Sequence, residues 1–315
     1  MLIFLPGMKY TKHYLAVVTA STIWGSFSFA LKPLARWSSV DILFYRVFFS
    51  AVLLLLVTLF FRRKAWDADR RTYAGLPAAA KKGIVLQALG GGLFLTANWF
   101  FFIYVLNHIS IKSASLAYLV CPILTTVLAY FFLKERLTRG QWGAVGLSTA
   151  GCLVLAFGHL TDLLYSMVIA LSYALYLVTQ RKNYGTDKII FLTIQVVFSA
   201  LLLLPFYPFY HGPAPAAGLF YGLITVIAVC YTIIPLWLSL YGLERLKSST
   251  VGIILYITPL LGFVIAVSCY GEKVDFQQGV AYGVIVLSVI LFSWWNPAIK
   301  STFAGKDAPG NSLGH

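Results

Sequence analysis

The sequence predicts an all-α membrane protein whose ten transmembrane helices form two inverted five-helix repeats. Three observations predict it: an apolar composition, ten separated apolar segments and an internal repeat. Of the 315 residues, 60% are apolar and 11% are charged, whereas a soluble domain is typically ~45–50% apolar and ~25% charged. A single water-soluble domain leaves much of its surface exposed and cannot cover this excess. We therefore expect a lipid environment.

The apolar segments are each close to the ~20 residues that a helix needs to cross a bilayer. Short polar connections separate them, and we expect each to be one spanning helix. The segments fall at roughly 13–33, 41–61, 84–106, 112–133, 141–158, 163–180, 189–209, 217–241, 249–270 and 277–295.

Lysine and arginine are unevenly distributed between the connections. Counted from a cytoplasmic N-terminus, nineteen of the 24 cationic residues fall on the cytoplasmic side and four on the other, with Arg46 inside a segment. Because cytoplasmic loops are enriched in these residues, we expect both termini in the cytoplasm. The net charge of +14 thus reflects membrane topology, and we expect no nucleic-acid partner.

An internal repeat appears at an offset of 137 residues, where Tyr104–Val154 aligns without a gap on Tyr241–Leu291. Five helices separate the matched positions, and this odd number places the second copy upside down. Inverted repeats are common in alternating-access transporters, with a substrate site near the midplane between them. We therefore divide the chain into a cytoplasmic N-terminus, a first five-helix repeat, a second inverted repeat and a disordered cytoplasmic tail, over residues 1–12, 13–158, 159–296 and 297–315.

Several motifs resemble those of a known family. The stretch Phe132–Thr138, followed by Gln141 and Gly146, resembles the junction between the fourth and fifth helices in EamA-type members of the drug/metabolite transporter superfamily. Five clusters of residues resemble the RarD branch of that family. They are Ile23–Gly25, Asp41–Leu43 with Arg46, Asn98–Trp99, Ala114–Leu116 with Tyr118, and Ser249–Thr250 with Tyr256. The resemblance implies a ten-helix bundle around a central cavity, metabolite export and a bacterial inner membrane. Gln195 departs from the pattern, because an acid is expected there in RarD relatives.

Arg46 is the one charge well inside an apolar segment. An intramembrane charge is costly and marks a functional site by default, and a guanidinium can hold a carboxylate or phosphate bidentately. The alternative is structural: the side chain snorkels, or it pairs with Asp41 and locks two helices. The sequence leaves both interpretations open.

The other candidate substrate-binding residues are aromatic or carry an amide. Tyrosine and tryptophan combine an apolar face with one hydrogen-bonding group, and an amide in hydrocarbon either ties helices together or faces a wet cavity. Packing is the alternative for each aromatic side chain. These candidates are Trp24, Asn98, Trp99, Tyr118, Tyr176 and Tyr256.

Pro122 and Pro259 occupy matched positions in the two copies. Proline removes a backbone hydrogen bond and kinks a helix, so we expect these two helices to form kinked walls of the cavity. Glu135 and Glu272, also matched, are expected to cap or tether helix ends.

The leading hypothesis is a secondary transporter for a small amphipathic metabolite, such as an amino acid or a related compound. No Asp or Glu lies deep in a segment, which favours facilitated diffusion or exchange without a proton relay. The alternatives are a broad drug exporter or lipid-phosphate flippase, a membrane enzyme, and a scaffold. The four cysteines lack metal-ligand spacing, and we expect no catalytic residue, metal or cofactor. The oligomeric state is left open.

Overall fold

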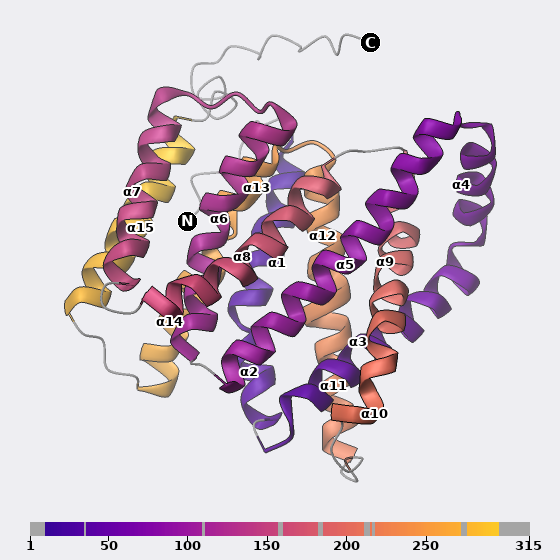
Figure 1. Cartoon of the computed structure of the whole chain (residues 1–315), viewed down its shortest axis with the longest axis horizontal. Coiled ribbons are helices and arrows are strands. Elements are labelled where there is room, and N and C mark those ends of the chain that lie inside the picture. The colour runs from indigo at the N-terminus through magenta and orange to yellow at the C-terminus, as the bar shows by residue number, and fades with distance from the viewer. Residues whose placement is uncertain are drawn as a thin grey trace.

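A computed structural model describes residues 10–34, 36–108, 111–156, 160–181, 185–210, 215, 218–271 and 276–295. Every regular element in these ranges is a helix (Figure 1). The expected N-terminal extension up to residue 9, Glu272 and the expected tail lie outside the described residues.

The first half of the chain is helical over each of its five expected apolar segments. A bend interrupts the first of these segments, and a π-helical turn interrupts the second. The elements are α1 (Thr11–Gly25), α2 (Phe27–Leu31), η1 (Lys32–Leu34), α3 (Ser39–Leu56), η2 (Val57–Phe61), α4 (Arg63–Gly75), α5 (Ala78–His108), α6 (Ile111–Leu133) and α7 (Arg139–Ala156).

The second half is likewise helical over its five segments, and three of these are broken into shorter pieces. The elements are α8 (Leu160–Gln180), α9 (Lys188–Leu203), η3 (Leu204–Phe206), α10 (Tyr207–Tyr210), α11 (Gly218–Ala228), η4 (Val229–Ile233), α12 (Ile234–Leu243), α13 (Ser248–Ile254), α14 (Ile257–Tyr270) and α15 (Phe276–Trp294).

Among the described residues, five helical stretches are long and apolar enough to cross a membrane, and a sixth counts if the bent pair α1–α2 is one span. Three further apolar helices are shorter, at 117–133, 164–180 and 279–294. This content of apolar helix makes the chain a multi-pass membrane protein.

The helices pack in pairs that mirror one another between the two halves of the chain. α6 packs on α8 as α14 packs on α1, and α5 packs on α8 as α12 packs on α1. α7 lies beside α15 at one edge of the bundle (Figure 1), where the hydroxyls of Ser148 and Ser288 are 2.6 Å apart. A glycine permits a close approach of α13 to α6: a Cβ on Gly252 of α13 would lie 2.9 Å from the Thr125 side chain of α6.

Three apolar segments are interrupted near the middle of the bundle. α1 and α2 meet at Ser26 with a bend of 41°. A π-helical stretch, η4, precedes Pro235 between α11 and α12. α13 and α14 are separated just before Pro259, which has no N–H for the Leu255 carbonyl; Thr258 N–H donates to that oxygen instead, at 3.0 Å.

Glu135 caps a helix of the other half of the chain, and the sequence-based expectation for this residue is confirmed. Its carboxylate accepts the backbone N–H groups of Ser248 and Ser249 at 2.7 and 3.1 Å and the Ser249 hydroxyl at 2.6 Å. These N–H groups belong to the first turn of α13, where no intrahelical acceptor exists. A side chain beyond the end of α6 therefore holds the start of α13.

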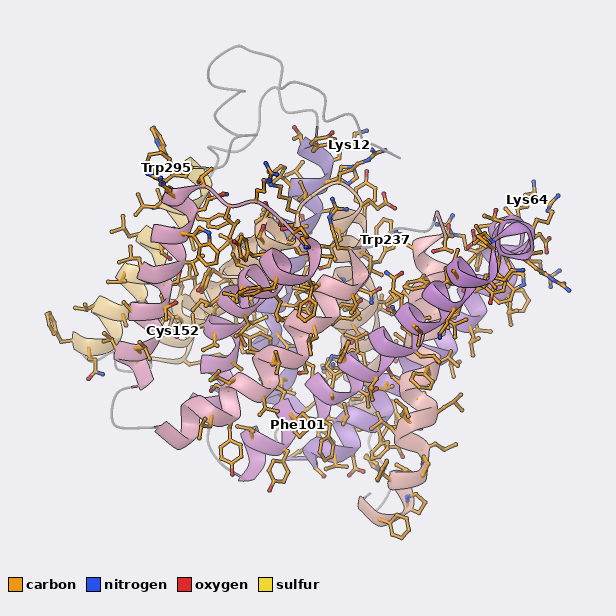
Figure 2. All side chains as sticks on the ribbon, turned by 45° about the horizontal axis from the view of Figure 1, so that its top comes forward. Lys12, Lys64, Phe101, Cys152, Trp237 and Trp295 are labelled. Carbon is orange, nitrogen blue, oxygen red and sulfur yellow. The ribbon has the colours of Figure 1, made fainter. Side chains whose placement is uncertain are left out.

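The amphipathic helix α4 was not predicted, because the basic stretch after α3 was interpreted only as a cytoplasmic connection. It stands apart from the bundle (Figure 1), and Lys64 projects from it at the edge of the molecule (Figure 2). The spacing of the aromatic residues Trp66 and Tyr73, at i and i+7, was the available helical signal.

α4 contacts the residue before α9 through the carboxylate of Asp69. The backbone N–H of Asp187 donates to Asp69 Oδ2 at 2.9 Å, and the Asp187 carboxylate lies 3.4 Å from Arg62. Burial beside α9 raises the pKa of the Asp69 carboxyl, while the hydrogen bond from Asp187 opposes that shift.

Lys12 and Trp295 mark the same end of the bundle, and Phe101 lies toward the opposite end (Figure 2).

Candidate functional site

A cavity of about 100 Å³ lies in the middle of the bundle, at the level of the three interruptions. Each interruption supplies lining residues, because a helix that stops or bends turns side chains of neighbouring turns toward the gap. α3, α5, α6 and α8 complete the wall. The described lining comprises Trp24, Phe27, Arg46, Asn98, Trp99, Phe102, Tyr118, Cys121, Tyr173, Tyr231, Thr232, Leu236, Leu255 and Thr258.

Arg46 enters this cavity from α3 without a hydrogen-bond or ion-pair partner in the part of the chain that the structure describes. Its Nε is buried and unpaired. The guanidinium lies over the ring of Trp99, 4.7 Å from the ring centroid, which is a cation–π contact. Arg46 makes no ion pair with Asp41, so the structural alternative of a locking pair between these residues is absent from the described contacts.

Trp24 closes the cavity at the bend of α1. Its Nε1 donates to the Tyr231 carbonyl at 3.1 Å. That carbonyl lies four residues before Pro235, which has no N–H to offer it. The indole ring also meets Tyr173 edge to face, with ring centroids 5.9 Å apart, so Trp24 joins α1 to both η4 and α8.

Asn98 ties two helices together and lines the cavity at the same time. Its side-chain N–H donates to the Ile169 carbonyl of α8 at 3.0 Å. The residue is only 2% exposed, so this bond keeps a buried amide paired. The bond joins α5 to α8 one residue before Trp99, which contacts Arg46.

The structure brings five of the predicted residues together around the cavity and leaves others apart. Trp24, Arg46, Asn98, Trp99 and Tyr118 line it. Tyr176 and Tyr256 are fully buried at 0% exposure with unpaired hydroxyls, and they do not line it.

The prolines flank the cavity without lining it. α6 continues through Pro122 without a break, whereas Pro259 directly follows the break between α13 and α14. Their neighbours reach the cavity instead: Cys121 beside Pro122, and Thr258 beside Pro259.

Several lining residues were missed by the sequence analysis, above all Tyr231 and Leu255. Tyr231 and Thr232 belong to the π-helical stretch, and π-helical turns occur frequently at functional sites. Pro235, only three or four residues further along the chain, was the available sequence signal for this interruption.

Two further polar side chains, Lys32 and Gln195, lie elsewhere. Lys32 sits over the ring of Tyr270, 3.5 Å from its centroid, and does not line the cavity. Gln195 is fully buried and donates to Gln180 Oε1 at 2.8 Å. Arg46 is therefore the one charged side chain among the described lining residues.

A bundle of apolar helices, interrupted around a central cavity that holds a charged side chain, is typical of multi-pass membrane transporters. The model of the EamA-like transporter family matches residues 11–157 and 160–294. The chain belongs to this family.

Some of the similar proteins are transporters by name. The chain is 29% identical over 286 residues to the "Uncharacterized transporter YojE" of Bacillus subtilis, covering 89% of this chain and 94% of that protein. It is 28% identical to "Protein RarD" of Escherichia coli, covering 88% and 92%. A solved crystal structure, 15% identical, superposes with a TM-score of 0.69 over 90% of this chain and 96% of the other, which concerns the fold alone. The resemblance to the RarD branch is confirmed.

Proposed function

We propose that the chain is a secondary transporter of the bacterial inner membrane. It moves a small amphipathic metabolite, an amino acid or a related compound, by alternating access to the Arg46 cavity. The observation that carries the proposal is the Arg46 guanidinium, which lies in the cavity without a counter-charge among the described residues.

An isolated cation inside an apolar bundle costs several kcal/mol unless an anion joins it. Stacking on Trp99 offsets part of that cost, by roughly 0.5–2 kcal/mol. A bound carboxylate offsets more, because it supplies both the opposite charge and two acceptors. Arg46 thus favours a ligand with an anionic group, and the aromatic walls favour one with an apolar part.

Alternating access requires two structural units that move relative to each other. We assign these units to residues 13–158 and 159–296, as two inverted five-helix repeats. The mirrored packing of α6 on α8 and of α14 on α1 supports this division. So do the sequence repeat at an offset of 137 residues and the two successive stretches that match the family model.

We assign both termini to the cytoplasm. The distribution of lysine and arginine, nineteen against four, supports this orientation. Because no acid is among the described lining residues, we propose facilitated diffusion or exchange without proton coupling.

A broad drug exporter or lipid-phosphate flippase is the second candidate. A second hollow, of about 530 Å³, is lined by aromatic and aliphatic side chains of α3 and by Tyr207 of α10. Its described lining contains no charged residue, so it favours an apolar cargo over a lipid phosphate.

The test is counterflow in proteoliposomes, with labelled amino acids and related carboxylates and with phosphorylated metabolites. Wild type is compared with Arg46→Ala and with Arg36→Ala as the matched control. Arg36 also lies over an indole ring, 4.0 Å from the centroid of Trp37, but does not line the cavity. Saturable exchange that Arg46→Ala abolishes and Arg36→Ala retains supports the proposal. Exchange that survives in Arg46→Ala contradicts the assigned site. If none of the soluble compounds is exchanged, the proposed class of transported substrate is contradicted.

A further inference from the structure

We propose that the Arg46 cavity selects a small monocarboxylate without an ammonium group. The inference rests on the proposed function. Within the substrate class proposed there, it retains simple organic acids and excludes the amino acids themselves. It follows from the charge balance, the occupied ring faces and the volume of the cavity.

The charge balance of the cavity favours a single negative charge. Arg46 is the one charged side chain among the described lining residues, and a carboxylate on its guanidinium makes the pair neutral. A phosphate monoester or a dicarboxylate leaves an additional negative charge in a site of low dielectric constant, where an unpaired charge is costly. Lys32 cannot compensate it from its position over Tyr270.

An amino acid carries an ammonium group, for which the described lining offers no carboxylate. The hydroxyls of Thr232 and Thr258 donate to the backbone carbonyls of Ile227 and Ser21, at 3.1 and 3.0 Å. Their oxygens can still accept a hydrogen bond, but a neutral hydroxyl does not neutralise a cation. An ammonium group buried here therefore remains uncompensated.

Aromatic rings can replace a carboxylate as partners of an ammonium group, but the rings best suited to this are already occupied. The guanidinium of Arg46 covers the ring of Trp99 at 4.7 Å. The rings of Trp24 and Tyr173 pack edge to face against each other. The rings of Phe27 and Tyr231 pack against each other with centroids 5.3 Å apart, and those of Phe102 and Tyr118 do so at 5.4 Å. The aromatic wall is thus arranged for one cation, and Arg46 is that cation.

The volume limits the size of the ligand. An engineered cavity of ~150 Å³ binds benzene, and this cavity measures about 100 Å³. It therefore suits a short carboxylate with a small apolar tail. Phe27, Leu236 and Leu255 provide apolar wall for that tail.

The experiment compares two solutes that differ at one position. Pyruvate and alanine share the carbon skeleton and the carboxylate, but the first has a ketone where the second has an ammonium group. Counterflow of each labelled solute is measured at pH 7 in proteoliposomes of the wild-type protein, so the comparison depends on no variant. We expect pyruvate to exchange at least about tenfold faster than alanine at equal low concentration.

A second measurement separates charge from shape. Thermal unfolding of the purified wild-type protein is followed with pyruvate, alanine or ethylamine. We expect only pyruvate to raise the unfolding temperature, and Arg46→Gln to abolish that rise while Arg36→Gln retains it. Exchange of alanine as fast as pyruvate overturns the inference and leaves the proposed transporter function intact. Failure of every soluble compound in the counterflow panel overturns both.

Discussion

Glu135 and Ser249 lie 114 residues apart in sequence, yet the Glu135 carboxylate accepts the Ser249 hydroxyl at 2.6 Å and its backbone N–H at 3.1 Å. Glu135 is only 8% exposed, and it also accepts the Ser248 N–H. The two residues connect the end of α6 to the start of α13. The contact thus joins the first half of the chain to the second.

Glu135→Ala is therefore expected to destabilise the protein by at least about 2–3 kcal/mol, because a hydrogen bond to a charged group is worth ~1.5–3 kcal/mol and the substitution removes three of them. Ser249→Ala removes only the hydroxyl and is expected to cost about 1 kcal/mol. Thermal unfolding in detergent, followed by tryptophan fluorescence, measures both. Asp67→Ala on the exposed face of α4 is the control, and equal effects of all three substitutions would contradict the capping role.

Trp24 is expected to stabilise η4 through the carbonyl that Pro235 leaves without an intrahelical N–H. Trp24→Phe removes the 3.1 Å bond to the Tyr231 carbonyl and should cost about 1 kcal/mol. Pro235→Ala supplies a backbone N–H that can reach the same carbonyl. In a double-mutant cycle, Trp24→Phe should then cost less in the Pro235→Ala background. Additive effects would show that the two residues act independently.

Gly252 is expected to tolerate no Cβ, because α13 lies too close to α6. An added Cβ meets Thr125 Cβ and Cγ2 at 2.9 Å, and overpacking of this kind costs about 1–3 kcal/mol. Gly143→Ala in α7 is the matched control, since its Cβ meets no atom within 4 Å. That substitution should be neutral or stabilise the helix by about 0.5–1 kcal/mol. The unfolding temperatures of the two variants provide the comparison.

Transport is expected to be independent of pH between about 6 and 8, a range in which an arginine stays charged and a simple carboxylic acid stays ionised. The described lining contains no histidine, aspartate or glutamate that titrates there. Counterflow rates at matched internal and external pH measure this. Uphill accumulation driven by a pH gradient alone would disprove the uncoupled mechanism.

The orientation of the bundle can be tested by labelling single cysteines in a background without native cysteines. Lys64→Cys on α4 is expected to face the cytoplasm. Phe209→Cys on α10, at a residue that is 80% exposed, is expected to face outward. A membrane-impermeant maleimide applied to intact cells should label only the second, and Lys64→Cys should react after permeabilisation. The reverse pattern would invert the proposed topology.

The site was partly predictable because intramembrane polar and amphipathic residues have few structural uses. Arg46 and Asn98 were singled out since a charge or an amide in hydrocarbon needs a partner or a cavity, and both line the cavity. Tyr176 and Tyr256 have the same chemistry as Tyr118, yet they are fully buried outside it. Composition cannot tell the cavity face of a helix from its packed face when nearly all of its residues are apolar.

The sequence by itself determined that this chain crosses a membrane repeatedly, which family it belongs to and where Arg46 lies along the second apolar segment, because these depend on local composition and residue order. Only the tertiary structure decided what surrounds that charge. Whether Asp41 pairs with Arg46, whether Trp99 stacks on it and whether Pro235 frees a carbonyl for Trp24 depend on how helices distant in sequence are rotated and bent against each other. Those rotations follow from the packing of the whole bundle, which no single segment encodes.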